Sequence, residues 1–175
     1  SALATTRSVA PMSAAIAATG SVEVGKRVAI AAAGHLAEVS LELGGKNPAI
    51  LHDATDLEPV LDEIMASAFA VCGQRCTAVS RVVVNRTLEA QVVAGLSKRA
   101  KAMQPMNGAS DGAKIGPLAS LQQLQDVDGF VTRAKAAGAT VAAGGEKLKM
   151  DTGGYFYTPT ILSNVTRDME VARDE

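Results

Sequence analysis

The chain has 175 residues, of which 47% are hydrophobic and 20% are charged, and its formal net charge is −1. This composition is that of a globular domain able to bury a core, which excludes the disordered and low-complexity classes. A net charge so close to zero provides no field that would attract nucleic acid or an acidic membrane, so we expect neither as a partner.

The cysteines and the N-terminus indicate the compartment. Cys72 and Cys76 are spaced C-x3-C with no further group of cysteine or histidine nearby, which matches neither a disulfide framework nor a zinc site. The first residues show no signal-peptide pattern, and the apolar stretch 9–18 is too short to span a bilayer. The sequence therefore predicts a soluble, cytoplasmic protein without a metal site.

The first predicted elements are a strand, a helix and a second strand. Residues 14–18 are small and apolar, as in a buried strand, and Ser21 is a good N-cap for a helix that runs to about residue 33. Residues 39–43 alternate as a strand does. A strand, a glycine turn and a capped helix place free N–H groups and the positive end of the helix dipole at one point, which suits a pyrophosphate. An ordinary strand-to-helix connection would explain the same residues.

The end of the second strand carries a carboxylate in an unusual setting. Glu42 stands between two leucines and just before Gly44 and Gly45. Burial there would raise its pKa, and the glycines would let another molecule approach the backbone closely. These are the properties of a general base.

A turn at 46–48, a short strand at 49–51 and an amphipathic helix are predicted next. Thr55 and Glu58 form a capping box at the start of that helix. The apolar stripe of the helix ends at Cys72, which we interpret as an inert core residue.

Cys76 lies beyond the helix stop at Gly73 and outside the helical register. Its neighbour Arg75 and the small residues after it predict an electropositive, accessible setting that favours the thiolate. A plain buried thiol is the alternative. A thiolate together with a carboxylate that activates water describes a mechanism in which an acyl group forms on sulfur and is hydrolysed. His52 could also serve Cys76 as a base, although a single histidine at a strand end is more often structural.

The remaining elements continue the alternation of strands and helices. Residues 80–84 form a strand, Thr87 caps a helix to about residue 103, Pro117 opens a helix to about residue 137, and residues 139–143 form a strand. Such repeats with right-handed crossovers predict an α/β fold with a mainly parallel sheet and flanking helices.

Four segments together resemble one enzyme family. LELGGKNP is followed by GQRCTA, with ATGSVEVG upstream and GGYFYTPTIL downstream. In this order they resemble the NAD(P)-dependent aldehyde dehydrogenases, and the match covers nearly the whole chain. The resemblance implies the tail end of a Rossmann-type cofactor domain at 1–41 and an aldehyde dehydrogenase-like catalytic domain at 42–175, both incomplete.

The resemblance also implies a reaction, the oxidation of an aldehyde to a carboxylic acid through a thiohemiacetal and a thioester on Cys76. Glu42 would activate the hydrolytic water, and the Cys76 N–H would stabilise the oxyanion with an asparagine from a segment preceding Ser1. A small aldehyde is the implied substrate, and GQRCTA looks somewhat like the semialdehyde dehydrogenases. A homo-oligomer, dimer or tetramer, is implied as well. The residues implied to contact NAD or NADP are Gly20, Ser21, Gly25, Leu43 and Glu175.

Two other functions fit the same residues. A cysteine hydrolase or thioesterase could use Cys76 and His52 without a cofactor, and a catalytically silent structural relative could keep the motifs. We also expect the 175 residues to be an internal piece of a longer enzyme and therefore to be inactive alone.

Overall fold

The computed structural model describes residues 15–175, so the first residue of the strand predicted at 14–18 lies outside the described residues. The chain divides into two compact units, residues 1–44 and residues 45–175. Each unit is described by itself. Among residues 15–175, no helix combines the length and the apolar character needed to cross a membrane.

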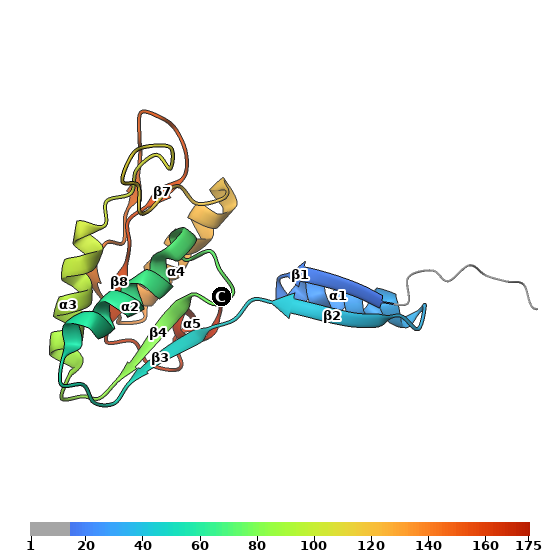
Figure 1. Ribbon diagram of the computed structural model, residues 1–175, viewed down its shortest axis with the longest axis horizontal. Coiled ribbons are helices and arrows are strands. Elements are labelled where there is room, and N and C mark those ends of the chain that lie inside the picture. The colour runs from blue at the N-terminus through green and yellow to red at the C-terminus, as the bar shows by residue number, and fades with distance from the viewer. Residues whose placement is uncertain (1–14) are drawn as a thin grey trace, which may run out of the picture. The chain divides into compact units, whose positions relative to one another are not determined.

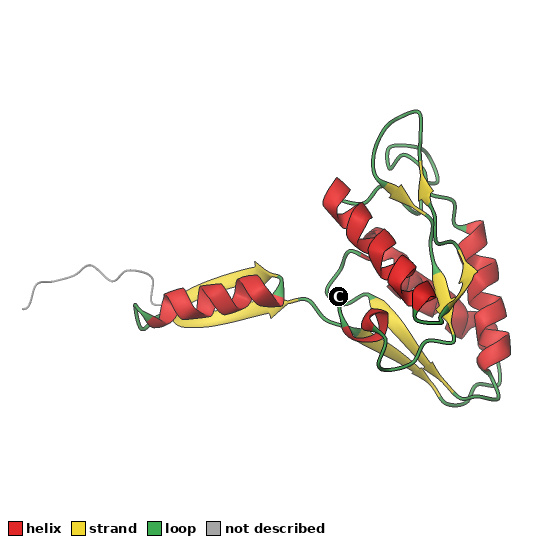
Figure 2. Cartoon of the chain, turned by 180° about the vertical axis from the view of Figure 1, so that it is seen from behind, coloured by secondary structure: helices red, strands yellow, loops and turns green. Residues whose placement is uncertain are grey.

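The first unit is a βαβ arrangement. The strands β1 (Ala15–Gly20) and β2 (Glu38–Leu43) pair in parallel, and helix α1 (Val22–Ala33) lies along one face of them (Figure 2). The side chain of Ser21 accepts a hydrogen bond from the N–H of Val24 at 3.3 Å, which confirms the predicted N-cap. The helix and the two strands are predicted from local pattern, but the burial expected for the first strand is not found within the described residues, where Ala15 and Ala17 are exposed.

The second unit is built on a parallel pair of strands covered by two helices (Figure 1). The strands are β3 (Asn47–Leu51) and β4 (Val79–Val84), and the helices are α2 (Leu57–Phe69) and α3 (Glu89–Ala102). A short 3₁₀ segment, η1 (Ala70–Gly73), follows α2. Apolar residues three or four positions apart along each helix form its buried face. The core contains Leu51, Leu61, Ile64, Met65, Val92, Leu96, Ala100 and Ala143.

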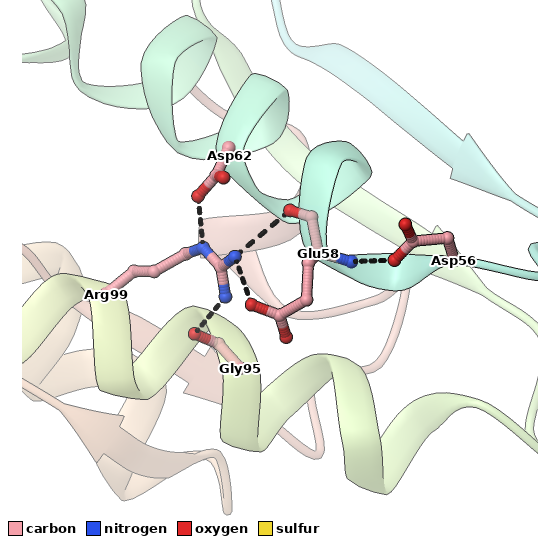
Figure 3. Close-up of polar contacts among 5 residues, drawn as sticks. All are labelled: Asp56, Glu58, Asp62, Gly95 and Arg99. Atoms are coloured by element: carbon pink, nitrogen blue, oxygen red, sulfur yellow. Dashed lines mark hydrogen bonds and ion pairs between the residues drawn. The ribbon is translucent and has the colours of Figure 1, made fainter.

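Arg99 joins the two covering helices at the edge of this core (Figure 3). Its Nε donates to Oδ1 of Asp62 at 2.6 Å, and its Nη2 donates to Oε2 of Glu58 at 2.9 Å and to the Glu58 carbonyl at 3.0 Å. The hydrogen bond to Asp62 is the main cause that raises the pKa of Arg99. The Arg99 side chain is only 15% exposed, and its hydrogen bonds link α3 to the first turns of α2.

The rest of the second unit adds two antiparallel pairs to the parallel one. Strand β5 pairs with β8, and β6 pairs with β7. The elements are α4 (Leu121–Ala136), β5 (Thr140–Ala143), β6 (Lys147–Leu148), β7 (Phe156–Tyr157), β8 (Ile161–Ser163) and α5 (Glu170–Arg173). Gly144 turns the chain after β5 with φ of 69°, and a Cβ on it would lie 2.1 Å from the Pro159 carbonyl oxygen. Only glycine fits such an approach.

Three predicted helix starts are wrong. The N-cap of α2 is Asp56, whose side chain accepts from the Glu58 N–H at 3.1 Å, and Thr55 is not the cap. Thr87 does not cap α3, because its N–H and Oγ1 both donate to Oδ1 of Asn85. The helix predicted from Pro117, α4, starts at Leu121.

The cap of α4 explains the later start. Ser120 accepts a hydrogen bond from the N–H of Gln123 at 3.1 Å and therefore serves as its N-cap. Leu118 instead forms an isolated antiparallel bridge with Tyr155, which holds the preceding residues in an extended conformation. The backbone of Pro117 and Leu118 is therefore not available to begin the helix.

Candidate active site

Cys76 lies in a tight turn directly before β4. The N–H of Ala78 donates to the Arg75 carbonyl at 3.0 Å and closes this turn over Cys76 and Thr77. Cys76 is an exposed free thiol, as the sequence predicted, and Arg75 beside it is exposed as well. The backbone N–H of Cys76 has no hydrogen-bond partner among residues 15–175. The turn therefore presents both a thiol and a free N–H donor.

The segment before this turn is left-handed for three residues. Val71, Cys72 and Gly73 have φ of 52°, 59° and 73°. A β-branched residue with positive φ is an outlier, so surrounding contacts must impose this conformation. The Cys72 Sγ supplies two of those contacts, since it accepts from the Gly116 N–H at 3.3 Å and donates to the Gly116 carbonyl at 3.4 Å.

The placement of Cys72 on the apolar stripe of α2 is wrong. The helix ends at Phe69, three residues before Cys72. The two thiols nevertheless differ in the predicted direction, because Cys72 is partly buried and Cys76 is exposed. The apolar spacing of the sequence predicted a helix that continues to Cys72, because such spacing carries no information about a left-handed turn.

Gln74 is a second anchor of the segment, and no pattern in the sequence singled it out. Its Oε1 accepts from the Ala119 N–H at 2.9 Å, and its Nε2 donates to the Val71 carbonyl at 3.4 Å. The side chain thus ties the segment both to itself and to the stretch that precedes α4.

Asn47 is the anchor closest to the nucleophile. Its Nδ2 donates to the Cys76 carbonyl at 2.6 Å and to the Ala78 carbonyl at 3.2 Å. The sequence analysis assigned residues 46–48 to a turn, but Asn47 is the first residue of β3 and pairs with Val79 of β4. The sequence signal that could have identified Asn47 is a side-chain amide that follows the two glycines of the LELGGKNP motif.

Arg81 of β4 connects the C-terminal residues to the residue that precedes β3. Its Nη1 donates to the Ala172 carbonyl at 3.2 Å, and its Nη2 donates to the Lys46 carbonyl. Burial lowers the pKa of Lys46, and the charge of Arg81 lowers it further, while Glu175 and Asp174 oppose this shift. Glu175 therefore lies within electrostatic reach of Lys46 in the second unit.

His52 does not lie near Cys76. It directly follows Leu51 at the end of β3, and Asn47, which contacts the Cys76 carbonyl, begins that strand. Five residues of extended strand span about 16 Å. His52 is also exposed, and the structure does not bring it to the thiol as a base.

In the first unit, the residues implied in cofactor binding gather at the carboxyl ends of the two strands. Gly20 and Leu43 are partners in the β1–β2 register, and Ser21 follows as the N-cap of α1. A Cβ on Gly25 would lie 2.7 Å from Cδ2 of Leu43, so this glycine lets the helix approach β2. The first N–H groups of α1 have no partner within the helix.

Two carboxylates of the first unit lie near the residues implied in cofactor binding, and one of them differs from the sequence expectation. Glu23 stands in the first turn of α1, but its Oε1 accepts from Nε of Arg27 at 3.4 Å, which partly balances its charge. Glu42 is exposed, so the burial predicted for it is not found within the described residues. The reason is alternation, since Leu41 and Leu43 take the partly buried side of β2 and Glu42 takes the other side.

Comparison with known proteins decides the family. The model of the aldehyde dehydrogenase family matches residues 4–175, nearly the whole chain. The chain belongs to the aldehyde dehydrogenase family. The resemblance inferred from the four sequence segments is therefore confirmed.

Curated relatives in this family are much longer than the chain. It is 39% identical over 166 residues to a betaine aldehyde dehydrogenase of Rhizobium etli, which covers 94% of the chain and 34% of that protein. It is 37% identical over 163 residues to an alpha-ketoglutaric semialdehyde dehydrogenase of Bacillus subtilis, covering 92% of the chain and 33% of that protein. The chain thus spans about a third of the length of these aldehyde dehydrogenases.

Solved aldehyde dehydrogenases share the fold. The enzyme of Bacillus cereus matches with a TM-score of 0.86 and 38% identity over 91% of the chain and 32% of its own. The betaine aldehyde dehydrogenase of Staphylococcus aureus, solved in complex with NAD+, matches with a TM-score of 0.88 and 32% identity over 92% of the chain and 32% of its own. These matches confirm the predicted α/β class.

Proposed function

We propose that the chain carries the nucleophile and the general base of an NAD(P)-dependent aldehyde dehydrogenase. The observation that carries this proposal is the exposed Cys76 in an anchored turn, with its own N–H free. Residues 1–41 then belong to the cofactor domain and residues 42–175 to the catalytic domain. A cytoplasmic homo-oligomer, a dimer or tetramer, that binds neither nucleic acid nor membranes completes the proposal.

Cys76 performs the covalent step. Its thiolate attacks the aldehyde carbonyl carbon, a C–S bond forms, and the carbonyl oxygen becomes an oxyanion. The free N–H of Cys76 is one donor for this oxyanion, and an effective oxyanion site needs further donors. Loss of hydride from the thiohemiacetal converts it into a thioester.

Gly20, Ser21, Gly25 and Leu43 fit the role of holding a dinucleotide. Ser21 caps the Val24 N–H, while the N–H groups of Val22 and Glu23 lack a partner within the helix and suit a phosphate, and Gly25 allows the close contact between helix and strand. Glu175 of the second unit, which lies within electrostatic reach of Lys46, is the remaining residue that we propose to contact NAD(P). When bound, the nicotinamide supplies the hydride acceptor for the oxidation.

Glu42 acts in the second half of the reaction. Its carboxylate accepts a proton from water, the resulting hydroxide adds to the thioester carbon, and the C–S bond breaks to release the acid and restore the thiolate. Its exposed position on β2 leaves the carboxylate open to water.

The test uses a complete enzyme, by which we mean a polypeptide of the relatives' length that carries this sequence. Glu42→Gln keeps the side-chain shape but cannot accept a proton, so we expect a burst of NAD(P)H followed by a slow steady state. Stopped-flow absorbance with betaine aldehyde and alpha-ketoglutaric semialdehyde, the aldehydes that name the two relatives, measures both phases. Loss of the burst itself would show that Glu42 acts before the thioester forms.

The same preparation separates the competing functions. A cysteine hydrolase would cleave acyl esters without nicotinamide, and a silent relative would give neither NAD(P)H nor ester cleavage. The wild-type complete enzyme should produce NAD(P)H only with an aldehyde present. Failure of every aldehyde in a broad panel would overturn the proposed function.

A further inference from the structure

Two carbonyl oxygens of the nucleophile turn accept hydrogen bonds from one side chain. The Asn47 Nδ2 lies 2.6 Å from the Cys76 oxygen and 3.2 Å from the Ala78 oxygen. Both partners can only accept, so the amide nitrogen and not its oxygen must face them. The contact therefore requires a donor at this position.

Asn47 is itself held firmly. Its backbone pairs with Val79 in the β3–β4 ladder, and its carbonyl accepts from Oγ of Ser80 at 3.4 Å. The same strand ends at Leu51, which is 5% exposed and belongs to the core. The amide thus links the turn to a strand that reaches the core of the second unit.

Bonding of the Cys76 carbonyl fixes the peptide plane that follows the nucleophile. The hydrogen bond from the Ala78 N–H to the Arg75 carbonyl closes the turn of residues 75–78 and restrains the backbone of Cys76 as well. Together the two restraints determine the backbone torsions at Cys76, which set the directions of its thiol and of its N–H. A misplacement of about 1 Å in a reacting group can cost about 100-fold in rate.

We propose that Asn47 is the positioning residue of the nucleophile turn, orienting Cys76 through its carbonyl without touching the substrate. This inference rests on the proposed function for its effect on turnover. Its effect on the turn itself is independent of that function. The two consequences can therefore be measured separately.

The test variant is Asn47→Asp, which keeps the shape but turns the donor into an acceptor that faces two carbonyl oxygens. Asn164→Asp is its matched control, because Nδ2 of Asn164 likewise donates to a backbone carbonyl, that of Gly138, at 3.1 Å. Asp also tolerates the positive φ of 56° at position 164. Asn47→Ala removes the donor without adding charge and replaces the Asp variant if that one fails to fold.

The first readout is hydrogen exchange of the Ala78 amide in the 175-residue chain, followed by NMR. We expect exchange at least about tenfold faster in both Asn47 variants and unchanged in Asn164→Asp, because only the former release the turn. An Ala78 exchange rate within twofold of the parent in both variants would overturn the proposal.

The second readout is turnover of the complete enzyme. Asn47→Ala should lower kcat by about 10- to 100-fold while KM for the aldehyde changes less than twofold. Iodoacetamide should still label Cys76 at a rate within about twofold, since the thiol stays exposed. An unchanged kcat with faster Ala78 exchange would reject the catalytic role of the contact. Absence of turnover in the parent would reject the proposed function, and the exchange result would still decide whether Asn47 holds the turn.

Discussion

The two thiols of the chain differ in what surrounds them. Cys76 is exposed at the apex of a turn, whereas the Cys72 sulfur is bracketed by the N–H and carbonyl of Gly116. A thiol that accepts and donates hydrogen bonds to backbone is less available to a reagent than a free one. The surroundings therefore predict different reactivities for two cysteines in one short segment.

We predict that iodoacetamide at neutral pH modifies Cys76 and leaves Cys72 largely unmodified in the 175-residue chain. Cys76→Ala should remove the modification, and Cys72→Ala should keep its rate within about threefold because Cys72 only supports the segment. Mass spectrometry of the peptides locates the label. Equal labelling of both thiols would contradict the assignment.

Residue types could be predicted here, but their contacts could not. The sequence selected Cys76 from its neighbours, because glycine before it and small residues after it are local features. It missed Asn47 because that contact joins residues far apart in the sequence, and it expected Glu42 to be buried because the flanking leucines suggested a core. A strand of alternating exposure buries the leucines and not the residue between them.

At the level of elements, the turn after β5 depends on one glycine. A Cβ on Gly144 would lie 2.1 Å from the Pro159 oxygen, and φ there is 69°. We predict that Gly144→Ala lowers the free energy of unfolding by more than about 2 kcal/mol, through strain and overlap with backbone. Gly108→Ala is the control, because nothing lies within 4 Å of a Cβ there. Urea titration of both variants checks this, and equal midpoints would contradict it.

Arg99 makes a smaller contribution between α2 and α3. We predict that Arg99→Met lowers the free energy of unfolding by about 1 kcal/mol, since solvent screens both carboxylates, which are 75% and 70% exposed. Arg167→Met serves as control, because Arg167 is 95% exposed and its contact with Asp168 is 3.8 Å long. Denaturant midpoints at low and high salt measure the effect, which should shrink with salt. A loss that is equal for both arginines would argue against the link.

The elements themselves were largely predictable and their ends were not. Long apolar periodicity correctly indicated α2, α3 and α4, because each buries one continuous face. The predicted helix starts were wrong where several neighbouring residues could serve as the N-cap, as Thr55 and Asp56 could for α2. They also failed where a contact distant in sequence holds the chain extended, as Tyr155 does for Leu118. The antiparallel pairs were missed because two or three strand residues carry too little pattern.

At the scale of the whole molecule, we predict that the 175-residue chain alone does not oxidise aldehydes. The described part of its first unit, residues 15–44, has two strands and one helix, whereas a dinucleotide fold uses two βαβ halves. Apolar side chains such as Leu36 and Ile50 are 94% and 76% exposed, so nothing among residues 15–175 covers them.

NADH production by the purified chain, compared with a complete enzyme, measures this. Thiol labelling of the same samples shows whether the nucleophile turn is formed, so labelling without turnover is the expected combination. Turnover within tenfold of the complete enzyme would refute the prediction.

The anchored segment also bears on how this family can change over time. Between residues 70 and 78, the anchoring contacts fall on alternate residues, at Cys72, Gln74, Cys76 and Ala78. Inserting or deleting one residue between them would therefore misplace at least one contact relative to the others. Residues 107–112 are all exposed and would absorb a change of length without loss of core. Lineages should therefore differ in length at 107–112 and keep the same count of residues from the end of α2 to the nucleophile.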